Sequence, residues 1–326
     1  MLENGYFYEE ALALTKRLVE IPSINGTEGE THVARYVHDW LAKLPYFQTH
    51  PQQLVVQELK NDPLHRINVL ALVRGTKSDC QDTLILQGHC DTVGIEDFGP
   101  LRDYAFDYQT LPEKIKALTQ DPEVLADIES GEWMFGRGAC DMKCGDAVLM
   151  CITKYFSENT GQFDGNIVYM LNPVEENQHY GIMDALDILL EWREKEKLNY
   201  LMSINTDFFS PAYPGDTHKY FHSGAVGKIL PCFYLIGKAT HVGHGFEGFS
   251  ATLAAAEIVR QMELQADLAD EYRGELTLPP LALRCRDLKP SYDVTSPQAC
   301  FLYFNYFIHS QPMAEIMGCL RRVAET

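Results

Sequence analysis

The sequence predicts an α/β protein, with a mostly parallel sheet flanked by helices and then a small α+β domain. Over the first two thirds of the chain, short apolar runs alternate with segments of helical periodicity. This alternation is typical of a sheet that carries helices on both faces. After the proline-rich stretch 211–214, the order changes to strand, helix, two strands and helix. We therefore expect two domains, 1–213 and 214–326.

The elements of the first domain follow from local patterns. A helix over 7–20 has apolar residues at helical spacing and should end before Pro22, because the residue before a proline avoids the α region. Thr27 and Glu30 have the spacing of a capping box, which predicts a second helix through Trp40. We also predict strands over 68–73, 83–87, 166–171 and 201–205, helices over 145–157 and 182–197, and a surface insertion over 96–131.

The second domain is expected to be a small sandwich. One long strand is predicted over 226–236 and a strong helix over 250–266. Strands over 281–285 and 300–307 and a helix over 313–325 complete it. This order lacks the last strand of such a sandwich, so we expect the domain to be incomplete at its C-terminal end.

Composition excludes several classes of protein. A net charge of −19 argues against nucleic acid and anionic membranes as partners, because phosphate binding needs a basic surface. No stretch approaches the roughly 20 apolar residues that span a bilayer, and the acidic N-terminus does not resemble a secretory signal. The nine cysteines are scattered without a CxxC pair, which indicates reduced thiols. We expect a cytoplasmic protein.

His89 and Asp91 lie just after an apolar strand, in the segment Gln87-Gly-His-Cys-Asp-Thr. Side chains two residues apart in an extended segment point to the same face. A metal-bound imidazole usually donates its other ring N–H to a carboxylate, so this spacing suits a metal ligand with its supporting acid. In isolation, a pair of this kind is more often coincidental or structural than a metal site.

Asp141 lies between three glycines, in a segment that runs directly into a helix. The glycines indicate a tight backbone near a ligand. The alternative is an aspartate that caps the helix. Cys140 and Cys144 flank Asp141, but their spacing lacks a matching second pair, which argues against a thiolate zinc site.

Glu175 and Glu176 follow the apolar strand 166–171, and Asp207 follows the strand 201–205. Adjacent carboxylates at the end of a buried strand are costly unless a positive charge lies there, although a solvated loop would also explain them. In α/β sheets, ligands bind at the carboxyl ends of the strands. Four strand ends that each deliver an oxygen or imidazole ligand predict a site for zinc, manganese or cobalt. The usual arrangement for two such ions is a shared, bridging carboxylate.

Together these blocks resemble the di-zinc peptidase family of carboxypeptidase G, aminoacylase, succinyl-diaminopimelate desuccinylase and peptidase T. The resemblance covers most of the chain, and the insertion 96–131 resembles the RocB branch, which is linked to arginine utilisation. It implies a zinc-peptidase-like fold and a zinc-dependent metallopeptidase or amidohydrolase. The domain 1–213 would bind metal and catalyse, and the domain 214–326 would be a lid that forms a homodimer.

The resemblance also implies a role for each residue. Metal ligands would be His89 and Asp207 on the first ion, Glu176 on the second, and Asp141 bridging both. Asp91 would steady His89, and Glu175 would be the general base. His241, in Gly-Lys-Ala-Thr-His, would be the lid histidine that polarises the scissile carbonyl in the neighbouring subunit; His222 and His244 are alternatives. The substrate would be a small acyl-amino acid or peptide.

One family feature is not found in this sequence. The second metal of the family takes a final histidine from a segment after the lid, and His309, on a strand of the lid, is in the wrong domain for that role. We therefore expect the second ion to bind weakly. Two hypotheses remain open: a metal-dependent amide hydrolase, and a truncated, catalytically inactive remnant that keeps the fold and part of the metal site.

Overall fold

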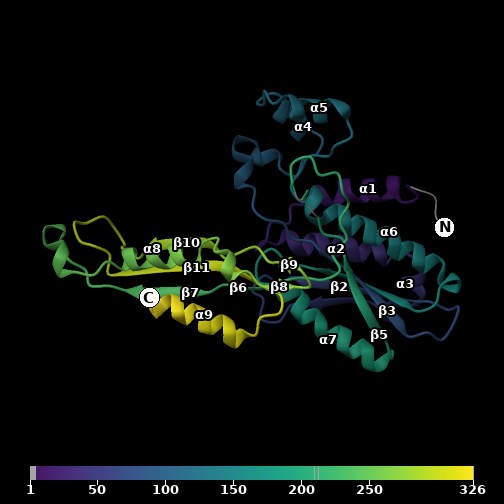
Figure 1. The fold of residues 1–326 in the computed structure, drawn as a ribbon. Coiled ribbons are helices and arrows are strands. Elements are labelled where there is room, and N and C mark those ends of the chain that lie inside the picture. The colour runs from purple at the N-terminus through teal and green to yellow at the C-terminus, as the bar shows by residue number, and fades with distance from the viewer. Residues whose placement is uncertain (1–4, 209, 212, 326) are drawn as a thin grey trace. The chain divides into compact units, whose positions relative to one another are not determined.

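The computed structural model describes residues 5–208, 210, 211 and 213–325. The chain forms two compact units, Met1–Asp216 and Thr217–Thr326 (Figure 1). The division falls three residues after the domain boundary expected near residue 213. Each unit has a hydrophobic core of its own.

The first unit is built on a five-stranded mixed sheet with the order β1-β2-β4-β3-β5. Strands β3, β4 and β5 are parallel, whereas β2 runs antiparallel to both of its neighbours. Four of the five strands therefore point the same way. The strands are β1 (Leu54–Glu58), β2 (Ile67–Arg74), β3 (Asp82–His89), β4 (Asn166–Asn172) and β5 (Asn199–Asn205).

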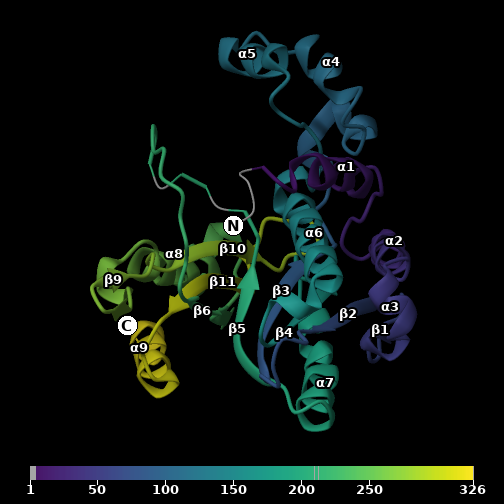
Figure 2. The same ribbon diagram turned by 90° about the vertical axis from the view of Figure 1, so that its right-hand side faces the viewer.

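Helices cover both faces of this sheet because the central strands are apolar on both sides. All seven residues of β4 are buried, as expected for a strand with no solvated face. Residues of α1, α2 and α6 pack in one hydrophobic cluster with the sheet and residues of α7 in another. The ribbon accordingly places α6 and α7 on opposite faces of the sheet (Figures 1 and 2). The helices are α1 (Tyr8–Val19), α2 (Gly29–Leu41), α3 (Pro45–Thr49), α6 (Cys144–Glu158) and α7 (Tyr180–Lys195).

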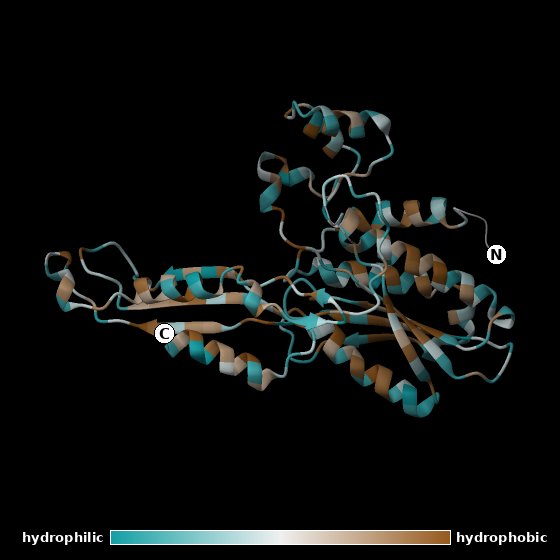
Figure 3. Ribbon diagram, in the orientation of Figure 1, coloured by the Kyte–Doolittle hydropathy of each residue, from teal (hydrophilic) through white to brown (hydrophobic). Residues whose placement is uncertain are grey.

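Hydropathy follows this layering. The strands of the sheet are predominantly hydrophobic, whereas the loops around them are mostly hydrophilic (Figure 3). Strand β5 differs, because it lies at the edge of the sheet and pairs only with β3. Its residues Leu201 and Met202 are each 55% exposed. No helix within the described ranges is long and apolar enough to cross a membrane.

The expected insertion forms short helices that project away from the sheet (Figures 1 and 2). They are η2 (Glu96–Tyr104), α4 (Leu111–Lys116) and α5 (Pro122–Ser130). The cap of α5 is a local one, since the Asp121 side chain accepts a hydrogen bond from the Glu123 N–H.

The second unit has an antiparallel sheet in which β11 is central. The strand predicted over 226–236 is wrong as a single element. It is two strands, β6 and β7, which both pair with β11 and are separated at Pro231, a residue with no N–H for a ladder bond. The elements are β6 (Gly227–Ile229), β7 (Cys232–Ile236), α8 (Ala251–Met262), the hairpin β8–β9 (Glu271–Tyr272 and Glu275–Leu276), β10 (Leu281–Asp287), β11 (Ala299–Ile308) and α9 (Met313–Glu325).

Candidate metal centre

Three parallel strands of the first unit bring polar side chains to one edge of the sheet. His89 is the last residue of β3, and it pairs in register with Asn172, the last residue of β4. Glu175 and Glu176 follow β4 by a few residues, and Asp207 follows β5 by two. Because the carboxyl ends of parallel strands share an edge, segments far apart in the sequence meet there.

His89 lies at the centre of this group and is only 2% exposed. Its Nε2 is 3.1 Å from Asp141 Oδ1, 3.7 Å from Asp207 Oδ2 and 3.8 Å from Glu175 Oε2. One ligand atom from each of His89, Asp141 and Asp207 lies within 4.8 Å of the others. An imidazole nitrogen and several carboxylate oxygens in this arrangement fit a divalent cation such as zinc.

Asp141 belongs to η3 (Ala139–Lys143), an irregular turn that leads into α6. It does not cap that helix, because the N-cap residue of α6 is Lys143 and the Asp141 carboxylate faces His89. Gly138 has a φ of 77°, and a Cβ there would lie 2.8 Å from a methyl carbon of Thr92. Only glycine therefore suits this turn.

The flanking cysteines make no thiolate site within the described residues. Cys144 Sγ donates to the carbonyl oxygen of Cys140 at 3.5 Å, and both thiols are free. The described group that could hold a metal contains no sulfur.

Asp91 is fully buried and supports several neighbours at once. Its backbone oxygen is 3.1 Å from His89 Nδ1, and its carboxylate Oδ1 is 3.5 Å from the same atom. The carboxylate also accepts the N–H of Glu175 at 3.0 Å, the N–H of Glu176 at 2.9 Å and the side-chain amide of Asn25 at 2.8 Å. Asp91 thus links the histidine to the two glutamates.

The carboxylates around His89 favour a positive charge there. Burial alone would lower the pKa of His89, yet Asp141 and Asp91 raise it to about 11. The site therefore stabilises a cation, a role that a metal ion would take over with the imidazole neutral. Burial, together with the Asp141 charge, raises the pKa of Asp207 above its usual range.

Two predicted residues are not among the side chains that face His89 Nε2 directly. Glu176 Oε1 accepts a hydrogen bond from the Val93 N–H at 3.2 Å, and burial followed by the Asp141 charge raises its pKa. His241 belongs to the second unit, where it precedes the turn η5 (Val242–Glu247) and its Nδ1 accepts a hydrogen bond from the Gly243 N–H.

The sequence patterns did not single out the buried charges beneath the site. Both carboxylate oxygens of Asp146, in the first turn of α6, lack a hydrogen-bond partner among the described residues. Burial raises the pKa of Asp146 well above its usual range. Burial also lowers the pKa of Lys143 to about 8, although its Nζ donates to the Ile21 carbonyl at 2.8 Å. Lys143 and Asp146 follow Asp141 by two and five residues, and that nearness in the sequence was the only available signal.

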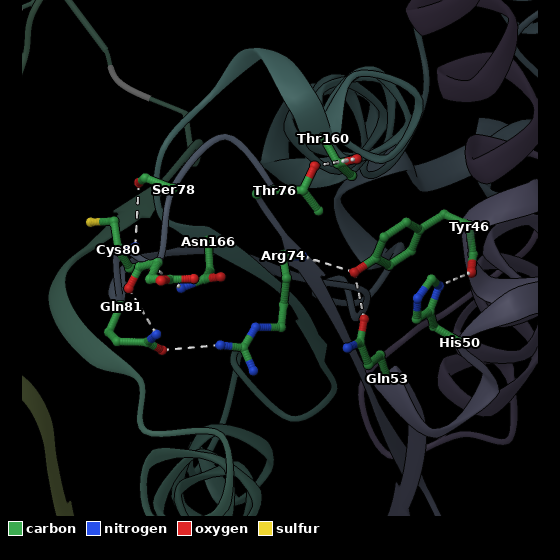
Figure 4. A pocket seen from close by; sticks show the side chains of 12 residues that line it. Tyr46, His50, Gln53, Arg74, Thr76, Ser78, Cys80, Gln81, Thr160 and Asn166 are labelled. Carbon is green, nitrogen blue, oxygen red and sulfur yellow. Dashed lines mark hydrogen bonds between the residues drawn. The ribbon is translucent and has the colours of Figure 1, made fainter.

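A cavity of about 480 Å³ lies at the other end of the parallel strands (Figure 4). Its most polar lining side chain, Arg74, is already paired. The guanidinium of Arg74 donates to Glu196 at 2.7 Å and to Gln81 at 3.0 Å, and the Tyr46 hydroxyl accepts the Arg74 N–H at 2.9 Å. It therefore offers no catalytic set comparable to that around His89.

A model of the Peptidase family M20/M25/M40 matches residues 104–275, more than half of the chain. The chain belongs to this family. The M20 chain is 42% identical over 317 residues to protein RocB of Bacillus subtilis (strain 168), a match that covers 97% of this chain and 56% of RocB. It is 26% identical over 236 residues to a succinyl-diaminopimelate desuccinylase of Beijerinckia indica. That match covers 72% of this chain and 52% of the desuccinylase. The M20 chain thus spans little more than half the length of these relatives.

Solved structures confirm the predicted fold class for the M20 chain. The YXEP protein of Bacillus subtilis, described as a dinuclear metal binding peptidase of the M20 family, has a TM-score of 0.54. It is 13% identical, and the match covers 99% of this chain and 70% of that one. The likeness extends over an α/β fold with flanking helices and a small second domain.

Proposed function

We propose that the chain is a metal-dependent hydrolase of an amide or peptide bond in a small acyl-amino acid or peptide. One observation carries this proposal: His89 Nε2 faces carboxylate oxygens of Asp141, Asp207 and Glu175 within 3.8 Å. Membership of a peptidase family supports it.

In this proposal His89, Asp141 and Asp207 hold a zinc ion, for which manganese or cobalt could substitute. When bound, the ion lowers the pKa of a water molecule and polarises the substrate carbonyl. Glu175 accepts a proton from the attacking water at its carboxylate and passes it to the leaving amine. Asp91 keeps the ring of His89 oriented through Nδ1, with Asp141 Oδ1 on the opposite ring nitrogen.

A second ion would be held by Asp141 and Glu176, with Asp141 bridging the two ions. A relative described as a dinuclear peptidase supports this arrangement. Asp141 and Glu176 are two ligand side chains, against three in the group His89, Asp141 and Asp207, so we propose that this chain binds the second ion more weakly than the first.

Substrate and partners are proposed from the relatives. The desuccinylase name supports an N-acylated amino acid, and the RocB relative supports a link to arginine utilisation. His241 is proposed to polarise the carbonyl in the partner of a homodimer formed through the domain 214–326. A cytoplasmic location is proposed from nine cysteines that all remain free thiols.

The test is hydrolysis by the purified chain with added zinc, manganese or cobalt on a panel of acyl-amino acids and dipeptides. Glu175→Gln should lower kcat by about 10²–10⁴-fold while the cobalt affinity stays close to wild type. Glu158→Gln, an exposed glutamate at the end of α6, is the control and should retain full activity. A chain that binds metal at His89 yet hydrolyses nothing on the panel would favour the inactive remnant instead.

A further inference from the structure

The loop that carries the two glutamates is held by two buried carboxylates. We call residues 173–177 the glutamate loop. Three successive backbone N–H groups of this loop donate to carboxylates: Val174 to Glu30 Oε1 at 3.0 Å, Glu175 to Asp91 Oδ1 at 3.0 Å and Glu176 to Asp91 Oδ2 at 2.9 Å. Asp91 lies next to His89, but Glu30 comes from α2, far from the site in sequence.

Glu30 is fully buried and connects three segments. Besides Val174, it accepts the Gly26 N–H at 2.8 Å and the Arg66 Nη1 at 2.9 Å, both on Oε2. The Arg66 guanidinium in turn binds both carboxylate oxygens of Asp62, at 2.8 and 2.9 Å. A buried carboxylate is tolerated when it is paired and its oxygens are satisfied, as here.

Val174 needs such a partner because of its backbone. Its φ is +68°, in the left-handed region that a β-branched residue rarely adopts, and its side chain is 2% exposed. Strained conformations persist where the surroundings over-determine them. The turn at Val174 sets the direction in which the next two residues leave β4, and Glu175 Oε2 ends 3.8 Å from His89 Nε2.

We propose that Glu30 is a positioning residue of the metal centre, which holds the Val174 N–H and thereby aims Glu175 and Glu176 at the space beside His89. The inference rests on the proposed function, because the orientation of Glu175 and Glu176 matters for catalysis only if a metal ion binds beside His89. Its physical basis is that outer partners of a metal site orient the groups around the ion. Glu30 itself touches neither His89 nor Asp141 in the hydrogen bonds of the described residues.

The variant Glu30→Gln separates this role from general stability. Its amide can keep an oxygen at the Oε2 position, where it still accepts from Gly26 and Arg66. The NH₂ group then faces the Val174 N–H, so the bond to the glutamate loop is the one that is lost. Asp62→Asn is the matched control, because it weakens the same buried network at Arg66 but leaves the contact between Glu30 and Val174 intact.

Two measurements on the full chain test whether Glu30 positions the glutamate loop. Cobalt(II) affinity and the visible spectrum of the bound ion report on the metal centre, and hydrogen–deuterium exchange of the metal-free chain reports on the amides of the glutamate loop. For Glu30→Gln we expect a 10- to 100-fold weaker affinity for the second cobalt ion, which Glu176 would hold, a changed cobalt spectrum and faster exchange in the peptide that contains the loop. Asp62→Asn should stay within about threefold of wild type and keep the wild-type spectrum.

The outcomes are separable from those of the proposed function. Wild-type cobalt affinity, spectrum and loop exchange in Glu30→Gln would overturn the positioning role, as would equal losses in Asp62→Asn. A wild-type chain that binds no cobalt would refute the proposed function, while the exchange comparison would still decide the role of Glu30. If Glu30→Gln does not fold, Glu30→Asp, which keeps the charge but is too short to reach both Arg66 and Val174, must show the same losses or the inference fails.

Discussion

Replacing Asp91 by asparagine should destabilise the first unit even when no metal is present. The change converts one carboxylate oxygen into an NH₂ donor. If the amide keeps its oxygen toward Glu176 and Asn25, the NH₂ faces the Glu175 N–H, and the negative charge 3.5 Å from His89 Nδ1 is lost. A buried donor left without an acceptor costs about 1–3 kcal/mol, and loss of the buried charge brings the total to about 2–5 kcal/mol.

Urea denaturation of the chain in EDTA, followed by tryptophan fluorescence, measures this loss. All three tryptophans lie in the first unit, so the signal reports on that unit. The matched control is Asp103→Asn, an exposed aspartate, which should change the unfolding free energy by less than about 0.5 kcal/mol. Folding lowers the pKa of Asp91 from 3.8, so its stabilising contribution exists above pH 3.8 and fades as the pH falls below it. A loss for Asp91→Asn no larger than that of the control would refute the reasoning.

Three further outcomes follow from the site. Zinc binding near pH 7.5 should release about one proton, because His89, with a pKa of about 11, must become neutral to bind a metal. Calorimetry in two buffers of different ionisation enthalpy measures the number of protons released. Binding without proton release would contradict the prediction. Asp207→Asn should weaken cobalt binding at least tenfold in a titration, while an unchanged affinity would exclude this ligand. Folding raises the pKa of Asp146, so its ionisation destabilises the fold as the pH rises above 3.8. In thermal unfolding with EDTA, the Tm of Asp146→Asn minus the Tm of wild type should therefore increase from pH 5 to pH 8. A Tm difference that stays constant over this range would argue against this.

The sheet edge at which the candidate metal ligands meet could be predicted from the sequence, because it depends on the order of strands and loops along the chain. His89 and Asp207 come at or just after the ends of parallel strands, and parallel strands align their carboxyl ends. The roles of these residues stay predictions. The mixed character of the sheet was harder to foresee, since β2 reads as an apolar strand in either direction. The short strand β1 left no clear pattern.

Glu30 shows why local patterns miss supporting residues. With Thr27 it resembles a capping box, and its carboxylate does reach back to a nearby backbone N–H, that of Gly26. The same carboxylate also binds Arg66 and Val174, which are 36 and 144 residues away. Contacts of that kind arise only from the packing of the whole unit.

Asp146 was missed for a related reason. An aspartate in the first turn of a helix is ordinarily a solvated partner of the helix dipole. Here the same turn packs against β3, and a Cβ on Gly88 would lie 1.9 Å from Asp146 Oδ1. The burial that makes this carboxylate unusual depends on a glycine almost sixty residues earlier in the chain.

The most direct test of the metal centre is a crystal structure of the chain grown with zinc, with anomalous diffraction recorded at the zinc edge. We predict an ion bound by His89 Nε2 at about 2.0–2.1 Å and by carboxylate oxygens of Asp141 and Asp207 at about 2.0–2.2 Å. Zinc bound elsewhere, with His89 still paired directly to Asp141, would contradict the account.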